Sequence, residues 1–518
     1  MLVILAFDTE DVYYPEDYGI DDIPGWLAAI MTSVGVTGTF YIMGEKAETL
    51  LARGRHDVLD QLRPHSLASH QQGNRYPLLP QVVEGLGWQE GVAAVRAYED
   101  WVSDAHQRAF GRAPAGFSRH NCYFAPQHLA VAGERGLAYQ YMIAQLPGSR
   151  QPLWYANALT FPSEGPNTFD GFDRIYSRDD IFEAHFGRLR RFVDERLQAG
   201  DEWVTIFGCH PVQVMARDWL EHYTLGSGRQ RTPQELGWLY RVKGRQEEPR
   251  AQANFRRLCQ FLKDHPDLEV VGMEEAARRF GGQPDQVDRD ALVAYTLSLA
   301  DRREIGFHPT FSPAELLLAM AEALVAAGVA GDLPEVVPRR AVLGPVALPV
   351  VARGLEWITH AELREACQDL LGHAQATGHL PANVAVRGER VGIGQLAMTA
   401  ARAYSAQARY DRYEQLALME APRYPALAYE LDAWVRRCIG DHWAMPLGFS
   451  CETLAQHTRL QTWTMKPAWL RPPQGPVAQG AYAGRQPWAS KPPAGEPPHP
   501  ALPAPAPPVP GPAIGGPT

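Results

Sequence analysis

Residues 2–11, LVILAFDTED, join an apolar run directly to a cluster of acids. A run of this length predicts a buried β-strand, so the acids lie where the strand ends. Asp8 and Glu10 project to the same side of such a strand, whereas Asp11 turns away unless the chain bends. Two carboxylates on one side can divide hydrolytic work, because one binds a metal while the other takes a proton from water. A solvated acidic loop is the alternative interpretation.

Strands and helices alternate over residues 1–282. A second apolar run, EWVTIFGCHP, ends at His210, and LEVVGMEEAARRF is a last strand that enters a helix. This alternation predicts an α/β fold with a parallel sheet or barrel, in which functional side chains gather at the carboxyl ends of the strands. Asp8 and His210 each follow an apolar run, so both are expected at that edge. His210 could act as a general acid or bind an oxyanion, and a core histidine bonded to backbone is the alternative.

The bulk composition excludes several classes of protein. A chain of 518 residues predicts two domains and a tail, and a formal net charge of −10 argues against nucleic-acid or anionic-membrane binding. No apolar run is long enough to span a bilayer, and the N-terminus lacks the basic segment of a secretory signal. The six cysteines form no CxxC pair, which favours reduced thiols. We therefore expect a cytoplasmic protein.

Residues 288–465 have the pattern of a mainly helical second domain. SPAELLLAMAEALVAAG begins with Ser312 and Glu315 in the spacing of a capping box. Two phrases that contain LP and Val, LPEVVPRRAVLGP and LPANVAVRGERVG, indicate a degenerate internal repeat, although two ordinary amphipathic helices explain them equally well. From residue 466 to 518, 17 of the 53 residues are proline, so this tail is expected to be disordered.

The stretch HSLASHQQGNRYP, residues 65–77, contains two histidines. His65 and His70 are five residues apart, about 500° of rotation on a helix, so they would not share a helical face. His70 and Asn74 have the four-residue spacing of a metal-binding pair, but an amide is a weak ligand. A structural histidine is an equal alternative at both positions. Further along, GFSRHNCYF supplies Arg119, which could orient a carboxylate.

In this order, the pieces resemble the polysaccharide deacetylases of carbohydrate esterase family four, which contain the NodB homology domain. LAFDTED is similar to the first family motif, HSLASHQQGNRYP to the second and EWVTIFGCHP to the last. VTGTFYIMGEKAETL is similar to the strand and helix after the first motif, and DWLEHYTLGSG to a bacterial subgroup. The resemblance covers residues 1–282. It implies a distorted (β/α) barrel and metal-assisted removal of N- or O-acetyl groups from sugars.

The resemblance also implies a role for each matching residue. Asp8 would be the general base, and His210 the acid that protonates the departing amine. Glu10 and His70 would bind a divalent metal, with zinc expected and manganese, iron or cobalt as alternatives. Arg119 would orient the base. His65 falls on a position that is not a ligand in the family.

The sequence departs from the family pattern at three places. Asn74 stands where the family has its second metal histidine, and His120 or Cys122 could replace that ligand. The third family motif, R-x-P-x-G, is RHNCY here, without its proline and glycine. No D-x-W-like fourth motif is found, and PLWYANALTFP occupies that region.

These observations lead to three hypotheses. The first is a metal-dependent hydrolase that removes acetyl groups from an N-acetylated carbohydrate or a related small amide. The second is a catalytically weakened member of the fold that binds glycan or acts as a scaffold. The third assigns the function to residues 288–465, whose LP and Val phrases resemble pseudomurein-binding repeats and would attach the protein to a polymer or protein partner.

Overall fold

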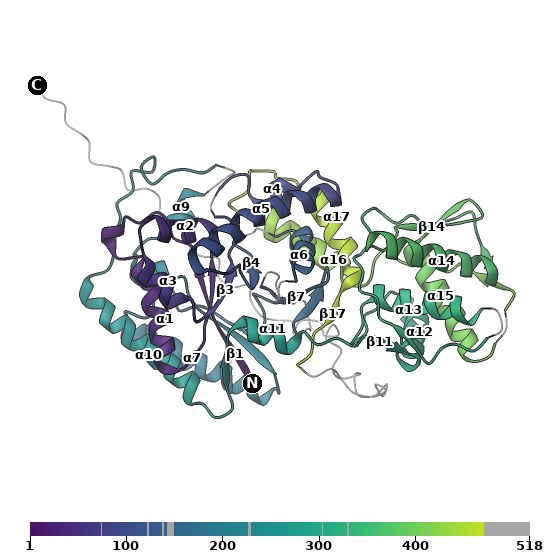
Figure 1. Ribbon diagram of the computed structural model, residues 1–518, viewed down its shortest axis with the longest axis horizontal. Coiled ribbons are helices and arrows are strands. Elements are labelled where there is room, and N and C mark those ends of the chain that lie inside the picture. Colours follow the sequence, from purple (N-terminus) through teal and green to yellow (C-terminus); the bar gives the residue numbers. More distant parts are fainter. Residues whose placement is uncertain are drawn as a thin grey trace, which may run out of the picture.

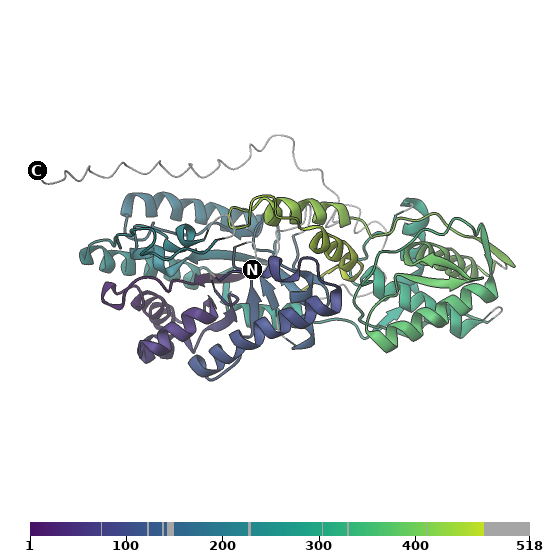
Figure 2. The same cartoon turned by 90° about the horizontal axis from the view of Figure 1, so that it is seen from above.

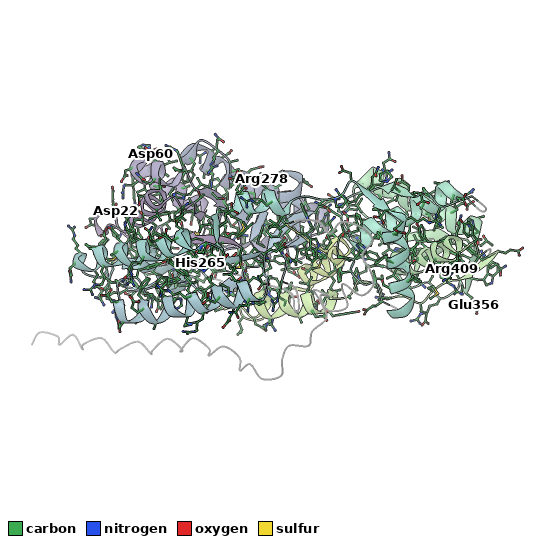
Figure 3. The ribbon with its side chains drawn as sticks, turned by 90° about the horizontal axis from the view of Figure 1, so that it is seen from below. Asp22, Asp60, His265, Arg278, Glu356 and Arg409 are labelled. Carbon is green, nitrogen blue, oxygen red and sulfur yellow. The ribbon has the colours of Figure 1, made fainter. Side chains whose placement is uncertain are left out.

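The computed structural model describes residues 1–470, except residues 74, 122–123, 137–138, 142–149, 226–228, 303, 329–330 and 412. Two units lie side by side in Figure 1, one with the N-terminus and the main sheet, the other with helices α12–α15. Figure 3 places Glu356 and Arg409 at the end of the second unit that is farther from the first. Of the helices that the structure describes, none is both long enough and apolar enough to cross a membrane.

The first unit is built on one sheet of eleven strands. These are β1 (Leu2–Thr9), β2 (Thr39–Ile42), β3 (Ser66–Ser69), β4 (Gly116–Ser118), β5 (Tyr139–Tyr141), β6 (Leu153–Tyr155), β7 (Ala158–Phe161), β8 (Thr168–Phe169), β9 (Trp203–Cys209), β10 (Glu269–Val271) and β17 (Lys466–Pro467). Their order is β17-β6-β7-β5-β4-β3-β2-β1-β9-β8, and β10 pairs with the first residues of β1. The pairs from β5 to β8 are all parallel, whereas β6 is antiparallel to β7 and β17.

Helices lie on both sides of this sheet in Figure 2. They are α1 (Asp22–Val34), α2 (Gly44–Ala52), α3 (His56–Leu62), α4 (Leu79–Val83), α5 (Trp88–Phe110), α6 (Pro126–Glu134), α7 (Asp179–Gln198), α8 (Pro211–Met215), α9 (Leu220–Thr224), α10 (Glu248–Asp264) and α11 (Met273–Phe280). Because helices connect most of the parallel strands, the predicted α/β class with a parallel sheet is confirmed.

Alternate side chains of β1 face two different cores. Val3, Leu5 and Phe7 pack into the larger core with α1, α7 and α10. The even-numbered residues between them pack into a smaller core with α11 and with side chains of β2, β3, β7 and β9. The apolar run at the start of the chain is therefore buried on both faces, as the sequence predicts for a strand inside a parallel sheet.

The sheet curves strongly, and the strand pairs of the described residues do not close it into a ring. Phe161 of β7 and Trp203 of β9 touch edge to face with ring centroids 5.5 Å apart, although five strands lie between them in the sheet order. Such a contact requires the sheet to roll around the smaller core, where Phe280 of α11 also meets Phe161. The strand pairs of the described residues leave β17 and β8 at opposite ends of the sheet, so the predicted barrel is not closed.

The second unit repeats one arrangement twice. β11 (Gln286–Asp288), α12 (Arg289–Arg302), α13 (Pro313–Ala327) and β12 (Val336–Pro338) form the first copy, in which the two strands pair antiparallel. β13 (Trp357–Thr359), α14 (His360–Thr377), α15 (Ile393–Ala408) and β16 (Gln415–Ala417) form the second, with the hairpin of β14 (Asn383–Val386) and β15 (Glu389–Gly392) inserted. α12 packs on α15 and α13 on α14, so each copy completes the other's core.

The boundaries of this structural repeat differ from those of the repeat that the sequence suggests. The phrase beginning at Leu333 follows α13 and contains β12, whereas the phrase beginning at Leu380 precedes α15 and contains β14. The two phrases therefore occupy different places in the two copies. What repeats is the order strand, helix, helix, strand. The capping box predicted at the start of α13 is present, with the Glu315 amide donating to Ser312 Oγ at 3.2 Å.

The chain returns to the first unit after the second copy. α16 (Ala428–Val435), a π-helical turn (Arg436–Gly440) and α17 (Glu452–Gln461) share a core with α4, α5 and α6. Tyr155 of β6 donates a hydrogen bond to the Thr458 carbonyl at 2.8 Å. The region predicted as one helical domain to residue 465 thus contributes its last part to the first unit. The predicted tail begins with a paired strand, β17, and residues 471–518 lie outside the described residues.

A buried ion pair connects the two units. Lys466 of β17 contacts both carboxylate oxygens of Glu315 in α13, at 2.7 and 2.8 Å, and both side chains are almost fully buried. Arg339 also contacts Glu315, at 2.8 Å. Removing one member of such a group leaves a buried charge with fewer partners, which destabilises the protein.

Replacing Lys466 tests the strength of this connection. We expect Lys466→Met to lower the free energy of unfolding by about 3 kcal/mol, the lower end of the usual range because Arg339 remains. Arg340→Met removes a more exposed pair with Glu322 and should cost less than about 1 kcal/mol. Urea unfolding followed by tryptophan fluorescence measures both losses. If both variants lose the same unfolding free energy, the buried pair stabilises the protein no more than an exposed pair does.

Candidate metal centre

Polar side chains from the ends of four parallel strands, β1, β3, β4 and β9, meet at one edge of the sheet. Asp8 is the next-to-last residue of β1 and Glu10 directly follows that strand, while His70 and His210 directly follow β3 and β9. His120 lies two residues beyond β4. Because β9, β1, β2, β3 and β4 run parallel, their carboxyl ends share this edge. The structure therefore brings Asp8, Glu10, His70 and His210 close together.

Glu10, His70 and His120 form a compact buried group. Glu10 Oε2 lies 3.2 Å from His70 Nε2 and 3.0 Å from His120 Nε2. The two imidazole rings meet edge to face with centroids 4.9 Å apart. One ligand atom from each of the three residues lies within 4.8 Å of the others. Ligands of a tetrahedral zinc, each about 2.1 Å from the ion, would lie roughly 3.4 Å apart, so this spacing suits such an ion.

The chemistry of the group also suits a cation. Glu10 Oε1 and Asp8 Oδ1 are buried oxygens that accept no hydrogen bond within the described part of the chain. A buried carboxylate oxygen without a donor is costly unless a cation compensates it. Imidazole nitrogens and carboxylate oxygens are ligands for zinc, and manganese, iron and cobalt accept the same set. The residues present therefore fit a divalent metal.

His120 occupies the position beside His70 that the sequence left open. It is one of the two residues predicted as replacements for the missing second histidine, and it comes from the loop after β4, not from the loop that contains His70. Cys122, the other candidate, and Asn74, the predicted weak ligand, lie outside the described residues. Asn74 as a ligand thus stays a prediction.

Asp8 lies near His70 and His210 and is partly exposed. Its Oδ2 is 3.8 Å from His70 Nε2 and 3.9 Å from His210 Nε2, and 19% of its side chain is exposed. Burial raises the pKa of Asp8, although the nearby histidines oppose the shift. For Glu10, burial acts in the same direction, but His210 and His120 outweigh it and lower the pKa well below its usual range. The two carboxylates thus differ: Glu10 holds its charge more strongly, whereas Asp8 accepts a proton more readily.

Asp173 orients His210, and sequence analysis missed it. Its Oδ2 lies 2.9 Å from His210 Nδ1, and its Oδ1 accepts the His210 main-chain N–H at 2.8 Å. Burial lowers the pKa of His210, but Asp173 and Glu10 outweigh it and raise the pKa to about 10. The signal in the sequence was weak, because TFDGFDRIY contains no D-x-W pattern. An acid shortly after the short strand β8, which neighbours β9, was the only indication.

Arg119 contacts residues other than the base. Its guanidinium donates to the Asn121 carbonyl at 2.9 Å and to Glu164 at 2.5 Å, and it lies over the Trp434 ring at 5.9 Å. Within the described residues, the charged neighbours of Asp8 are histidines and Glu10, not Arg119. The expected role of Arg119 in orienting Asp8 therefore has no contact to support it here.

His65 and Asp11 have structural partners. The His65 ring accepts the Gly38 N–H at 3.1 Å and lies 3.1 Å from the Ala28 carbonyl, at the opposite end of β3 from His70. This agrees with the prediction that His65 is not a ligand. Asp11 is buried near Lys46, and burial raises its pKa to about 6.

A pocket of about 280 Å³ opens beside Asp8 and His210. Its wall contains serine, threonine and asparagine side chains, two phenylalanines and two further charged residues: Ser118, Arg119, Asn121, Ser163, Thr168, Phe169, Asp170, Gly171 and Phe207. Phe207 contacts the His210 ring edge to face at 4.9 Å. The pocket thus offers an aromatic surface next to His210 and hydrogen-bonding groups around it.

Comparisons with known proteins give only weak similarities. No protein-family model and no curated protein matches the sequence. A provisionally named polysaccharide deacetylase from Mycobacterium smegmatis has a TM-score of 0.36 and 14% identity, over 54% of this chain and 88% of its own. A second provisionally named polysaccharide deacetylase, from Pseudomonas aeruginosa PAO1, has a TM-score of 0.34 and 14% identity, and the match covers 54% of this chain and 89% of its own. The allantoinase Puue has a TM-score of 0.34 and 10% identity, and the match covers 54% of this chain and 89% of its own.

Metal binding by point variants tests the assignment of His120. We expect His120→Ala to lower the affinity for Co²⁺ or Zn²⁺ by more than about 100-fold, because the loss of a direct ligand exceeds that of an outer partner. His65→Ala, which removes a buried histidine at the other end of β3, should leave the affinity unchanged. Titration against a chelating dye measures both. If Asn74→Ala reduces the affinity more than His120→Ala does, the amide is the third ligand.

Proposed function

We propose that the protein is a metal-dependent hydrolase that removes the acetyl group from an N-acetylated carbohydrate or a related small amide. The main support is the gathering of three kinds of group at one edge of the sheet, where Asp8 and His210 also line a small pocket. A candidate metal set (Glu10, His70, His120), a carboxylate with a raised pKa (Asp8) and an imidazole with a raised pKa (His210) all lie at one edge of the sheet. The motifs that resemble the polysaccharide deacetylases supply four of these residues, in the expected order.

Glu10, His70 and His120 would bind the metal. A divalent metal there supplies a Lewis acid that polarises the acetyl carbonyl and lowers the pKa of water. Glu10 suits this role because its lowered pKa keeps it ionised at neutral pH. Zinc is the ion we expect, with manganese, iron or cobalt as alternatives.

Asp8 would act as the general base. Its carboxylate faces the metal set and is partly open to the pocket. A base is most effective when its pKa lies near the working pH, and burial moves the pKa of Asp8 in that direction. Asp8 would take the proton of the water that attacks the acetyl carbonyl carbon.

His210 would act as the general acid. With its pKa raised to about 10, its imidazole is protonated at neutral pH. The bond from Nδ1 to Asp173 leaves Nε2 to face Asp8 and Glu10. The Nε2 proton would pass to the amide nitrogen as the bond between carbon and nitrogen breaks, which yields acetate and a free amine.

The size of the pocket favours a small substrate. At about 280 Å³ it lies just below the usual range for ligand sites, which suits one sugar residue or a small amide. Its serine, threonine and asparagine side chains can bond to hydroxyl groups. A polymer or protein partner for the second unit stays a prediction, as does the cytoplasmic location.

Acetate release tests the proposed reaction. Protein that has bound one metal ion should release acetate from an N-acetylated sugar or small amide, and a chelator should abolish the release. We expect Asp8→Asn and His210→Ala to reduce kcat/KM by about 100-fold or more, because general acid–base groups typically contribute that much. An enzymatic acetate assay on a panel of acetylated sugars measures this. Metal-loaded protein that binds glycan but releases no acetate would support the weakened, glycan-binding alternative.

The pH profile tests the role of Asp173. Asp173 raises the pKa of His210, so Asp173→Asn should lower that pKa, and His210 loses its proton at a lower pH. We expect the alkaline limb of kcat/KM to move to lower pH by at least about one unit. Asp180→Asn, which changes an exposed carboxylate on α7, should leave the limb in place. An unmoved limb in Asp173→Asn would exclude His210 as the acid.

A further inference from the structure

A buried carboxylate, Glu99, contacts a residue next to His70 and a histidine that stacks on the strand before His120. Glu99 of α5 is fully buried, and it accepts a hydrogen bond from Ser69 Oγ at 3.3 Å and pairs with His128 Nε2 of α6 at 2.8 Å. Ser69 and His128 are also fully buried. A charged group at such a position costs stability unless it is fully compensated, and an apolar side chain would often be at least as stable. Its presence therefore points to a role beyond packing.

Through Ser69, Glu99 is connected to the turn that contains His70. Ser69 ends β3 and directly precedes His70, and Ser69 Oγ accepts the Gln71 N–H at 3.0 Å. Gln71 has a φ of 65°, an uncommon conformation for a residue with a side chain. The Gly44 N–H also donates to the Gln71 carbonyl, at 2.9 Å. The turn is thus maintained by bonds from both sides.

Through His128, Glu99 is connected to β4, the strand that precedes His120. The His128 ring stacks face to face on Phe117 of β4, with centroids 4.1 Å apart and planes only 9° from parallel. Phe117 is three residues before His120. The paired positions of β3 and β4 are Ser69 and Phe117, the same two residues that the Glu99 group contacts. Glu99 therefore connects the ends of the two strands at the point where they pair.

This connection matters because the two histidines come from different strands. Two ligands from one loop are held at a fixed spacing by that loop, whereas His70 and His120 depend on how the ends of β3 and β4 lie relative to each other. A metal site tolerates only a few tenths of an ångström of error in its ligand positions. Something must therefore fix these two strand ends together.

We propose that Glu99 is a positioning residue for the metal centre. Through Ser69 it fixes the turn of His70, and through His128 and Phe117 it fixes the strand that leads to His120. The metal ligands then lie at the correct separation before the ion arrives. This inference rests on the proposed function only in that Glu10, His70 and His120 bind a metal.

Cobalt binding to the full-length protein tests this role. We expect Ser69→Ala and Glu99→Leu each to weaken Co²⁺ binding by about 10- to 100-fold and to change the visible absorption of bound Co²⁺, which reports ligand geometry. Glu99→Gln keeps the shape of the side chain and can still bond to both Ser69 and the His128 ring, so it should retain most of the affinity that Glu99→Leu loses. The double variant Ser69→Ala with Glu99→Leu should lose little more than either single one, because both break the same connection.

A buried bond elsewhere on α6 provides the matched control. Gln127 lies next to His128 in sequence and bonds to His457 at 2.7 Å, away from β3 and β4. Gln127→Leu should lower stability but leave the Co²⁺ affinity and spectrum unchanged. If Ser69→Ala also binds Co²⁺ with the affinity and spectrum of the unaltered protein, Glu99 serves stability alone and the inference is wrong, even if Glu99→Leu fails to fold. Failure of the unaltered protein to bind any metal would instead overturn the proposed function, and the inference with it.

Discussion

The burial of β1 on both faces is the constraint on which the rest of the structure depends. Its alternate side chains fill two cores, so the strand can neither shift by one residue nor rotate without exposing an apolar face. Asp8 and Glu10 at its end are consequently fixed at the edge of the sheet. Because β9 and β2 pair with β1 in parallel, the ends of their neighbours arrive at the same edge. The parallel direction of the strands thus determines where the site lies, and the individual side chains determine only its chemistry.

Charge organises the site once the strands have placed it. Burial alone would favour the neutral form of both carboxylates, and it does so at Asp8. At Glu10 the two closest imidazoles and His210 reverse the effect. Asp173 in turn raises the pKa of His210. Each group therefore influences the protonation of the next, and these opposite shifts support the proposed division into ligand, base and acid.

The origin of the second histidine changes what the scaffold must do. A metal-binding histidine pair within one loop needs only that loop to be ordered, whereas the proposed pair of His70 and His120 needs β3 and β4 to end at a defined separation. The buried contacts of Glu99, Ser69 and His128 lie at that junction. The final helices add support from the other side, since Trp434 of α16 packs on Phe124 and over Arg119 in the loop region of His120. The segment after the second unit is therefore part of the frame around the site.

The sequence alone determined the local features: the apolar strands, the alternation that makes an α/β fold, and the acids and histidines at strand ends, Asp8, Glu10, His70 and His210. These depend on neighbouring residues in the chain, so a short stretch suffices to predict them. Only the tertiary structure decided that the strand pairs of the described residues do not close the sheet into a ring, that residues 428–470 return to the first unit, and that His120 and Asp173 join the site. Those outcomes depend on contacts between residues from 37 to more than 300 positions apart, such as Asp173 with His210 and Tyr155 with Thr458. No local pattern encodes such contacts, because the packing of the whole chain selects them.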